Sequence, residues 1–212
     1  ETYKVKGLNM VNMRPFTAFE QKNLKFLVNH NVKFTQVEIT STGLGKGILD
    51  STAPMRAYFL ENGIHNYEEQ LQGQEHKQIK QACILTDATQ FFTKASFYRP
   101  NTKKGDPRMW IYGFGSYTEG NDIHVLFWHE QTLYSINISH IDIEKCYDSV
   151  LITPMQEILK EINKEGNSVS EELLGRFRAV KDQWFESEVT ADTGIGRTIE
   201  SFLGISINSD KT

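Results

Sequence analysis

Residues 94–112, KASFYRPNTKKGDPRMWIY, contain two strand-like ends and a middle that cannot be regular structure. Proline lacks a backbone donor and has a fixed φ, so Pro100 and Pro107, with Gly105, interrupt both helix and strand. The stretch sets one acid, Asp106, against five basic residues: Lys94, Arg99, Lys103, Lys104 and Arg108. Aromatic residues lie between them. This composition favours binding of a polyanion, because lysine and arginine attract phosphates and arginine also pairs with base edges. The alternative is a solvated loop whose charges only maintain solubility.

The segments around this loop predict the fold. Five short, apolar and β-branched or aromatic stretches are separated by turn residues, which is typical of strands in a small barrel. They are HKQIKQACILT (76–86), QFFTKASFY (90–98), RMWIYGF (108–114), DIHVLFW (122–128) and LYSINIS (133–139). With a further strand at 33–40, we expect six or seven antiparallel strands. The predicted class is α+β, mainly β with flanking helices: an open pseudobarrel of about seven strands with a C-terminal helical extension.

Helix signals lie on both sides of the predicted barrel. Thr17 and Glu20 have the spacing of a capping box, which predicts a helix to about residue 29. Pro54 opens a short helix that ends at Gly63. Between them, STGLGKG (41–47) is expected to be a flexible loop. Because Gly47 follows Lys46 where a P-loop requires serine or threonine, this loop does not predict nucleotide binding.

The C-terminal third changes in both pattern and charge. Apolar stripes predict one helix from Thr153 to Gly166, another from Ser168 to about residue 187, and a last one from Gly194 to Leu203. Ten acids against six basic residues lie between residues 157 and 200, so these residues account for the net charge of −4. We therefore predict a division into residues 1–150, a barrel; 151–190, a helical linker; and 191–212.

Other residue types exclude several classes of site. Cys83 and Cys146 lack a CxxC partner, so buried free thiols in a reducing, cytoplasmic compartment are expected. The six histidines show no paired spacing that would predict zinc, and we predict no metal site. No apolar run is long enough for a membrane helix.

Two rival functions remain open at this stage. Asp50, Glu75 and Lys77 could form a metal-dependent nuclease centre of the PD-(D/E)xK type, provided that the ExK step lies on a strand. Alternatively, helices within residues 153–187 could bind a partner protein.

The C-terminal stretch DTGIGRTIESFLGISI (192–207) resembles the opening helix of the MvaI/BcnI family of restriction endonucleases. The family pattern is matched by Gly196, Ile199, Glu200, Leu203 and Gly204. The resemblance implies a Mg²⁺-dependent nuclease domain in which Glu200 is a helper acid near the metal. The sequence stops about where the catalytic aspartate of the family should follow, so we expect residues 191–212 to be a truncated start of that domain and the fragment itself to be non-catalytic and to hold no cofactor.

Residues 33–140 resemble the N-terminal effector domains of EcoRII-type and UbaLAI-type restriction endonucleases. The segments that carry this likeness are STGLG (41–45), YRP (98–100), GDPRMW (105–110) and LYSINIS (133–139). The likeness implies a DNA-binding pseudobarrel that grips the major groove with two arms, here residues 41–48 and 99–108. It also implies a type IIE enzyme, a CCWGG-like site in double-stranded DNA, and a monomer joined to its own nuclease domain.

These arms give specific expectations for single residues. Arg99, Arg108 and Asn101 are predicted to contact base edges, because arginine pairs with guanine and asparagine with adenine. Four lysines are predicted to contact phosphates: Lys46, Lys94, Lys103 and Lys104. Thr42 belongs to the first arm. Trp110, like Tyr98, could touch bases or support the loop from beneath, and Asp106 could either brace Arg108 or accept from cytosine.

Overall fold

Seven strands form one sheet in the part of the chain that the computed structural model describes, which is residues 13–180 without the side chains of 172, 173 and 175–180. The strands are β1 (Phe34–Glu38), β2 (Leu49–Asp50), β3 (Gln78–Leu85), β4 (Gln90–Tyr98), β5 (Arg108–Ile111), β6 (Ile123–His129) and β7 (Thr132–Asn137). Their spatial order is β1-β6-β7-β3-β4-β5-β2. The prediction of a seven-stranded, mainly β fold is confirmed.

The prediction that every pair is antiparallel is wrong at one place. β3 and β7 run parallel, with Gln81 opposite Thr132 and Leu85 opposite Ile136. Hairpin signals in a sequence report only pairs joined by short turns. On the side opposite β4, β3 pairs with β7, which follows β4, β5 and β6 in the sequence. No local sequence signal predicts that pairing. The sheet is therefore mixed.

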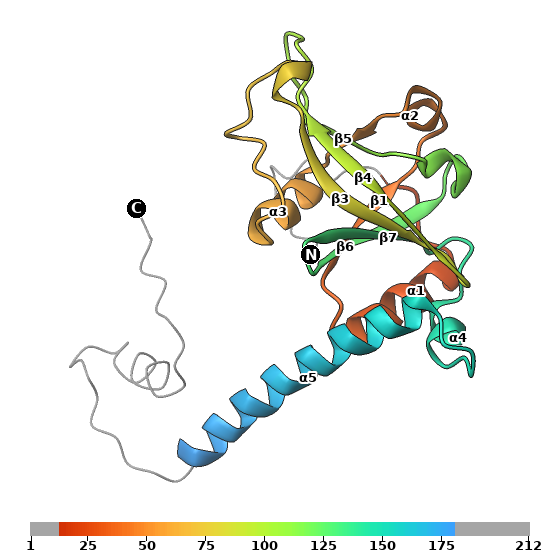
Figure 1. Ribbon diagram of the computed structural model, residues 1–212, viewed down its shortest axis with the longest axis vertical. Coiled ribbons are helices and arrows are strands. Elements are labelled where there is room, and N and C mark those ends of the chain that lie inside the picture. Colours follow the sequence, from red (N-terminus) through yellow and green to blue (C-terminus); the bar gives the residue numbers. More distant parts are fainter. Residues whose placement is uncertain (1–12, 181–212) are drawn as a thin grey trace, which may run out of the picture. The chain divides into compact units, whose positions relative to one another are not determined.

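The sheet curls into a half-barrel whose two edge strands are β1 and β2 (Figure 1). Its concave side encloses a core that includes Phe97, Met109 and Leu126. Helix α3 (Ala53–Glu61) covers this side and contributes Met55 and Phe59, both fully buried. The Phe59 and Phe97 rings meet edge to face with centroids 5.3 Å apart. Fold class and open-barrel form agree with the prediction.

The convex side of β6, β7 and part of β3 is covered by three helices: α1 (Ala18–Asn29), α4 (Ile143–Tyr147) and α5 (Pro154–Val180). Their apolar faces form a second core with Val125, Phe127 and Ile136 of the sheet. Two 3-10 turns, η1 (Gln74–His76) and η2 (Phe114–Ser116), complete the described elements. Cys83 and Cys146 are buried and free, as expected. None of the described helices is long and apolar enough to cross a membrane.

The start of α1 is held by a buried ion pair. The Arg14 guanidinium donates to both Glu20 oxygens at 2.9 and 2.5 Å, and the Ser139 hydroxyl donates to Glu20 at 2.5 Å. Thr17 and Glu20 also form the predicted capping box. The Arg14 hydrogen bond, against the opposing effect of burial and with help from Ser139 and the Thr17 N–H, lowers the pKa of Glu20 to about 2. This cluster fastens α1 to the end of β7.

Helix α5 differs from its prediction. Two helices were expected, one ending at Gly166, but a single helix runs from Pro154 to Val180. A glycine inside a helix costs only about 1 kcal/mol relative to alanine, and the residues around it are good helix formers. The Thr153 cap is confirmed, with Gln156 N donating to the Thr153 hydroxyl at 3.3 Å. The predicted helix 194–203 lies outside the described residues.

The chain divides into two compact units, residues 1–162 and 163–212. All of the described strands and the helices α1–α4 belong to the first unit. In the second unit, the described part is the end of α5.

Candidate nucleic-acid interface

A cavity of about 400 Å³ lies where the two edge strands of the curled sheet approach each other. We call this region the seam. Its walls come from β1 on one side, from β2 and the start of β5 on the other, and from the segment that links β1 to β2. The polar residues that line the cavity are Gln36, Glu38, Thr40, Thr42, Lys46, Asp50, Thr52 and Arg108. Both positive and negative side chains therefore face one hollow.

The linking segment is a helix, α2 (Ser41–Lys46), rather than the flexible loop that its glycines predicted. The Thr40 hydroxyl caps its start by accepting from Gly43 N at 3.0 Å, and Gly47 ends it in the left-handed conformation with φ 64°. These are ordinary start and stop signals for a helix. Three glycines within seven residues favour a loop, and this preference outweighs the cap signals when only the sequence is considered.

Two glycines hold α2 close to the barrel. A side chain at Gly43 would place its Cβ 2.6 Å from the Ile48 carbonyl oxygen, so only glycine fits there. Gly47 packs on Trp110, and a Cβ at that position would lie 3.6 Å from the indole ring. Trp110 is half-buried and also meets Phe114 edge to face with ring centroids 5.9 Å apart. Trp110 thus supports the end of the first arm from beneath.

The end of the first arm is hydrogen-bonded to the end of the second. In the β2–β5 ladder Leu49 lies opposite Met109 and Asp50 opposite Arg108, and Ser51 N donates to the Pro107 carbonyl at 2.9 Å. Two predicted arms that are about 60 positions apart in the sequence therefore meet at the seam. Thr42 and Lys46 of the first arm and Arg108 of the second line the same cavity.

Arg108 is held loosely. Its Nε lies 3.7 Å from Asp50 Oδ1, too far for a hydrogen bond, and this buried nitrogen has no hydrogen-bond partner among the described residues. The Asp50 side chain is 81% exposed. A guanidinium that is partly buried but incompletely bonded is available to a ligand in the cavity.

Arg99 has a different position from Arg108. Its Nε donates to the Gly105 carbonyl at 3.0 Å, and its Nη1 donates to the carbonyls of Gln70 at 3.2 Å and Tyr67 at 3.4 Å. Gly105 is buried against the Gln72 side chain, and its φ of 60° favours glycine. Arg99 therefore ties the second arm to the segment that follows α3, whereas the sequence predicted that it would reach a base.

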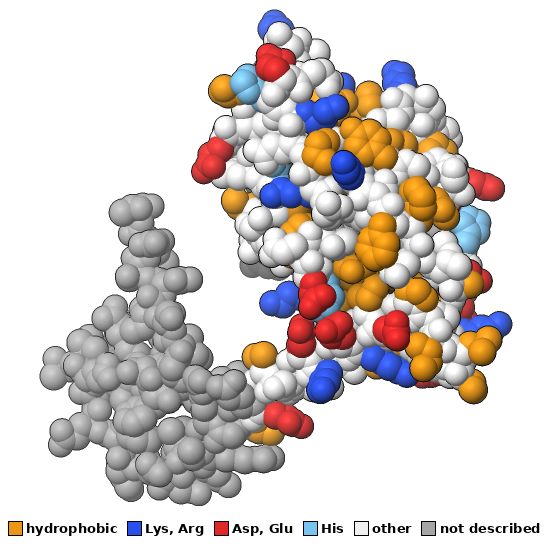
Figure 2. All heavy atoms as spheres, in the orientation of Figure 1, with side chains coloured by type: hydrophobic (Ala, Val, Ile, Leu, Met, Phe, Trp, Pro, Cys, Tyr) orange, Lys and Arg blue, Asp and Glu red, His pale blue; other side chains and the backbone are white. Residues whose placement is uncertain are grey.

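The remaining basic and polar side chains of the second arm face solvent. Asn101, Lys103, Lys104 and Asp106 are exposed, and Asp106 does not pair with Arg108 as one alternative proposed. Lys94 is exposed on β4, and its carbonyl accepts from the N–H of Tyr112, one residue after the end of β5. No ion pair within the described residues involves Lys46, Lys94, Lys103 or Lys104. On the face seen in Figure 2, basic side chains are scattered among apolar ones over the upper strands.

Sequence reasoning missed Glu38 and considered Asp50 only as part of a nuclease centre. Glu38 lies on β1, where its carboxylate accepts from Arg14 N at 2.9 Å, and Asp50 forms half of the two-residue strand β2. Nothing in either local sequence marks a binding residue. Glu38 and Asp50 share a cavity only because the sheet curls and brings its edge strands, β1 and β2, to the two sides of that cavity.

The nuclease alternative fails on local structure. A PD-(D/E)xK centre needs the ExK step on a strand, but Glu75 lies in η1 and Lys77 precedes the first residue of β3. The Glu75 side chain is 69% exposed, with His76 Nε2 3.9 Å from its carboxylate, and the Asp50 side chain is 81% exposed. The local structure therefore does not support a catalytic set at Asp50, Glu75 and Lys77.

Comparison with known families gives one match. Residues 174–212 match the MvaI/BcnI restriction endonuclease family. No curated protein and no solved structure matches the chain. The match supports a relationship to restriction endonucleases, enzymes whose substrate is DNA. Most of the matched residues, Glu200 among them, lie outside the described residues.

Proposed function

We propose that the half-barrel is a sequence-specific, double-stranded DNA-binding domain, the effector part of a type IIE restriction endonuclease. Its target would be a short pseudopalindrome of the CCWGG kind. The proposal rests on two independent supports. One is the restriction endonuclease match at residues 174–212. The other is the chemistry of the seam, described next.

One observation carries the proposal: α2 and the start of β5 present Thr42, Lys46 and Arg108 to a single cavity that also contains Glu38 and Asp50. Reading a G·C-rich site in the major groove requires donors for guanine and acceptors for the cytosine amino group. Arginine supplies the first and a carboxylate the second. A surface that only attracted phosphate would not need acids beside its arginine.

Within this proposal the residues have three roles: some contact base edges, some contact phosphates, and some hold the two arms in position. Arg108 reads guanine and Asn101 a neighbouring base, while Asp50 and Glu38 accept from cytosine. Four lysines contact phosphates and so position the duplex without reading it: Lys46, Lys94, Lys103 and Lys104. Arg99 and Trp110 hold the two arms in place.

Cleavage is assigned in this proposal to the nuclease-like part that residues 174–212 match, with Mg²⁺ as its cofactor and Glu200 as a helper acid. Binding of a second site by the half-barrel would stimulate that activity. The domain division at 150 and 190, a monomeric state and a cytoplasmic location belong to the same proposal.

Fluorescence anisotropy with a CCWGG duplex and a scrambled duplex, at several salt concentrations, tests the binding. We expect Arg108→Ala to weaken cognate binding by about 1–3 kcal/mol and to reduce discrimination, whereas Lys103→Ala weakens both duplexes alike and lowers the salt slope. Lys25→Ala, on the exposed side of α1, is the matched control and should change neither.

Three results would count against the proposal. Affinity that does not fall with salt would favour a protein-interaction module instead. Equal affinity for both duplexes in the unmodified chain would remove the sequence-reading role. Loss of binding in Lys25→Ala comparable to that in Lys103→Ala would place the DNA on the helical side of the barrel.

A further inference from the structure

The turn between β6 and β7 has an unusual backbone for its sequence. His129 and Thr132 form the last pair of the ladder, so the hairpin loop consists of Glu130 and Gln131 alone. Both residues have positive φ, 44° and 61°. Two-residue hairpin turns of this kind favour Asn-Gly, because other L-residues are strained there. The turn keeps a glutamate next to His129 at the tip of the hairpin.

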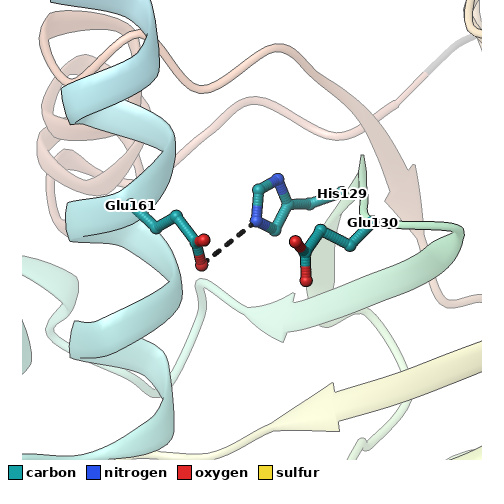
Figure 3. A group of neighbouring side chains, drawn as sticks. All are labelled: His129, Glu130 and Glu161. Atoms are coloured by element: carbon teal, nitrogen blue, oxygen red, sulfur yellow. Dashed lines mark ion pairs between the residues drawn. The ribbon is translucent and has the colours of Figure 1, made fainter.

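His129 is the group that calls for an explanation. Its side chain is only 9% exposed, and the buried Nε2 has no hydrogen-bond partner within the described residues. A buried polar nitrogen without a hydrogen-bond partner is destabilising. This nitrogen points toward α5, where Glu161 Oε2 lies 3.4 Å away (Figure 3).

Glu130 completes the group. One ligand atom from each of His129, Glu130 and Glu161 can be chosen so that all three lie within 4.8 Å of one another. Two carboxylates this close repel each other, yet among the described residues neither forms an ion pair with a lysine or arginine. Lys160, the neighbour of Glu161, lies over the Tyr147 ring at 5.5 Å from its centroid. In Figure 2 acidic side chains gather beside a histidine where the hairpin meets α5.

The spacing between His129 and Glu161 fits two ligands of a shared ion better than a direct contact. Imidazole and carboxylate ligands of tetrahedral zinc lie about 2.0–2.2 Å from the metal, which sets two ligand atoms about 3.3 Å apart. The observed 3.4 Å between His129 Nε2 and Glu161 Oε2 agrees with that separation, and it is long for a hydrogen bond.

We propose that His129, Glu130 and Glu161 bind one zinc ion, or a first-row divalent ion of similar chemistry, with water as the fourth ligand. An imidazole ligand favours zinc over Mg²⁺ and Ca²⁺, which prefer oxygen alone. The ion joins the β6–β7 hairpin to α5 and neutralises the two carboxylates. Because His129 and Glu161 are about 30 positions apart without a paired-histidine motif, no local sequence pattern predicts this site.

Calorimetric titration of the untagged chain with ZnCl₂ tests the site. We expect one ion per chain, a higher melting temperature with zinc than with Mg²⁺, and an affinity lowered at least about ten-fold by His129→Gln or Glu161→Gln. Glu161 is 52% exposed, so its variant should fold even if His129→Gln does not. Co²⁺ in place of zinc should give visible d–d absorption that both variants lose.

Matched controls are His76→Gln and Glu171→Gln, which remove an exposed histidine and an exposed glutamate elsewhere. Both should bind zinc as the unmodified chain does. The proposal is overturned if the controls and the site variants bind zinc equally, or if zinc binds without a defined stoichiometry and leaves the melting temperature unchanged. Neither result would bear on DNA binding, because the site lies apart from the residues that line the seam.

Discussion

Two arginine–carboxylate pairs of the half-barrel are built very differently. Arg14 grips Glu20 with two nitrogens at 2.9 and 2.5 Å, and the Glu20 side chain is 1% exposed. Arg108 approaches Asp50 at 3.7 Å, and the Asp50 side chain is 81% exposed. Glu20 also accepts from Ser139 and Thr17, whereas no hydrogen bond reaches Arg108 Nε.

The difference distinguishes a charged pair that stabilises the fold from a charged residue that remains able to bind a ligand. A fully bonded, buried pair has nothing left to offer a ligand, and breaking it leaves an uncompensated charge. A solvated pair contributes little to stability. The same residue types therefore fasten α1 at one place and leave a guanidinium free to bind at the other.

Among the substitutions that test this comparison, Glu20→Gln should have the largest effect on stability. We expect it to lower the free energy of unfolding by about 3 kcal/mol, because Arg14 then lacks a charged partner in a buried site. Urea denaturation measures the change. The control is Glu144→Gln, which removes an exposed partner of Lys22 and should cost less than about 0.5 kcal/mol. Equal costs for the two variants would contradict the distinction.

Acid should remove the Glu20 contribution selectively. The folded pKa of about 2 lies below the ordinary value of 4.5, so ionised Glu20 stabilises the native state. By linkage, this contribution is about 3 kcal/mol, fully present above about pH 5 and lost as the pH falls toward 2. Urea midpoints of the unmodified chain and of Glu20→Gln should therefore converge in acid. A constant gap across that window would argue against the assignment.

The rigidity of the seam can be tested without changing charge. Gly43→Ala should destabilise the protein by about 1–3 kcal/mol, because its Cβ would lie 2.6 Å from the Ile48 carbonyl oxygen. Gly45→Ala is the matched control in the same helix, where nothing lies within 4 Å of the new Cβ. We expect it to be neutral or stabilising by up to about 1 kcal/mol. If both variants lost stability equally, the close packing of α2 would be wrong.

Asp50→Asn should have the smallest effect on stability. We expect a change of less than about 0.5 kcal/mol in urea denaturation, since an exposed ion pair at 3.7 Å contributes little. Its effect should instead appear in DNA binding, where scrambled duplex binds more tightly after loss of the negative charge and discrimination decreases. A loss of stability as large as that of Glu20→Gln would show that Arg108 is held rather than available.

Much of the barrel was predictable because its signals are local. The capping box at Thr17, the turn residues between strands and the Gly63 stop each act within a few positions, and each is confirmed. The α2 helix was missed because the propensity of three glycines outweighed the Thr40 cap. At Gly166 the sequence predicts a helix end, but α5 continues through this residue. A single interior glycine does not end a helix when good helix formers lie on both sides.

The candidate sites depend on contacts that no local pattern encodes. Arg99 and Arg108 look equivalent in the sequence, nine positions apart in one basic loop. Their roles differ only because the segment after α3 offers its carbonyl groups to Arg99. Asp50 and Glu38 acquire a shared cavity through the curl of the sheet, and His129 meets Glu161 only after α5 packs against the hairpin.

The long-range strand pairings indicate an order in which these sites form. β3, β4 and β5 follow one another and pair locally, but β3–β7 joins residues about fifty positions apart, and β1–β6 residues about ninety apart. Closing such long loops is entropically costly, so these pairings are expected late in folding. The second arm can therefore form early with its own hairpin, while the seam cavity waits for β1 to dock. We therefore expect its mixed charges to come together late in folding.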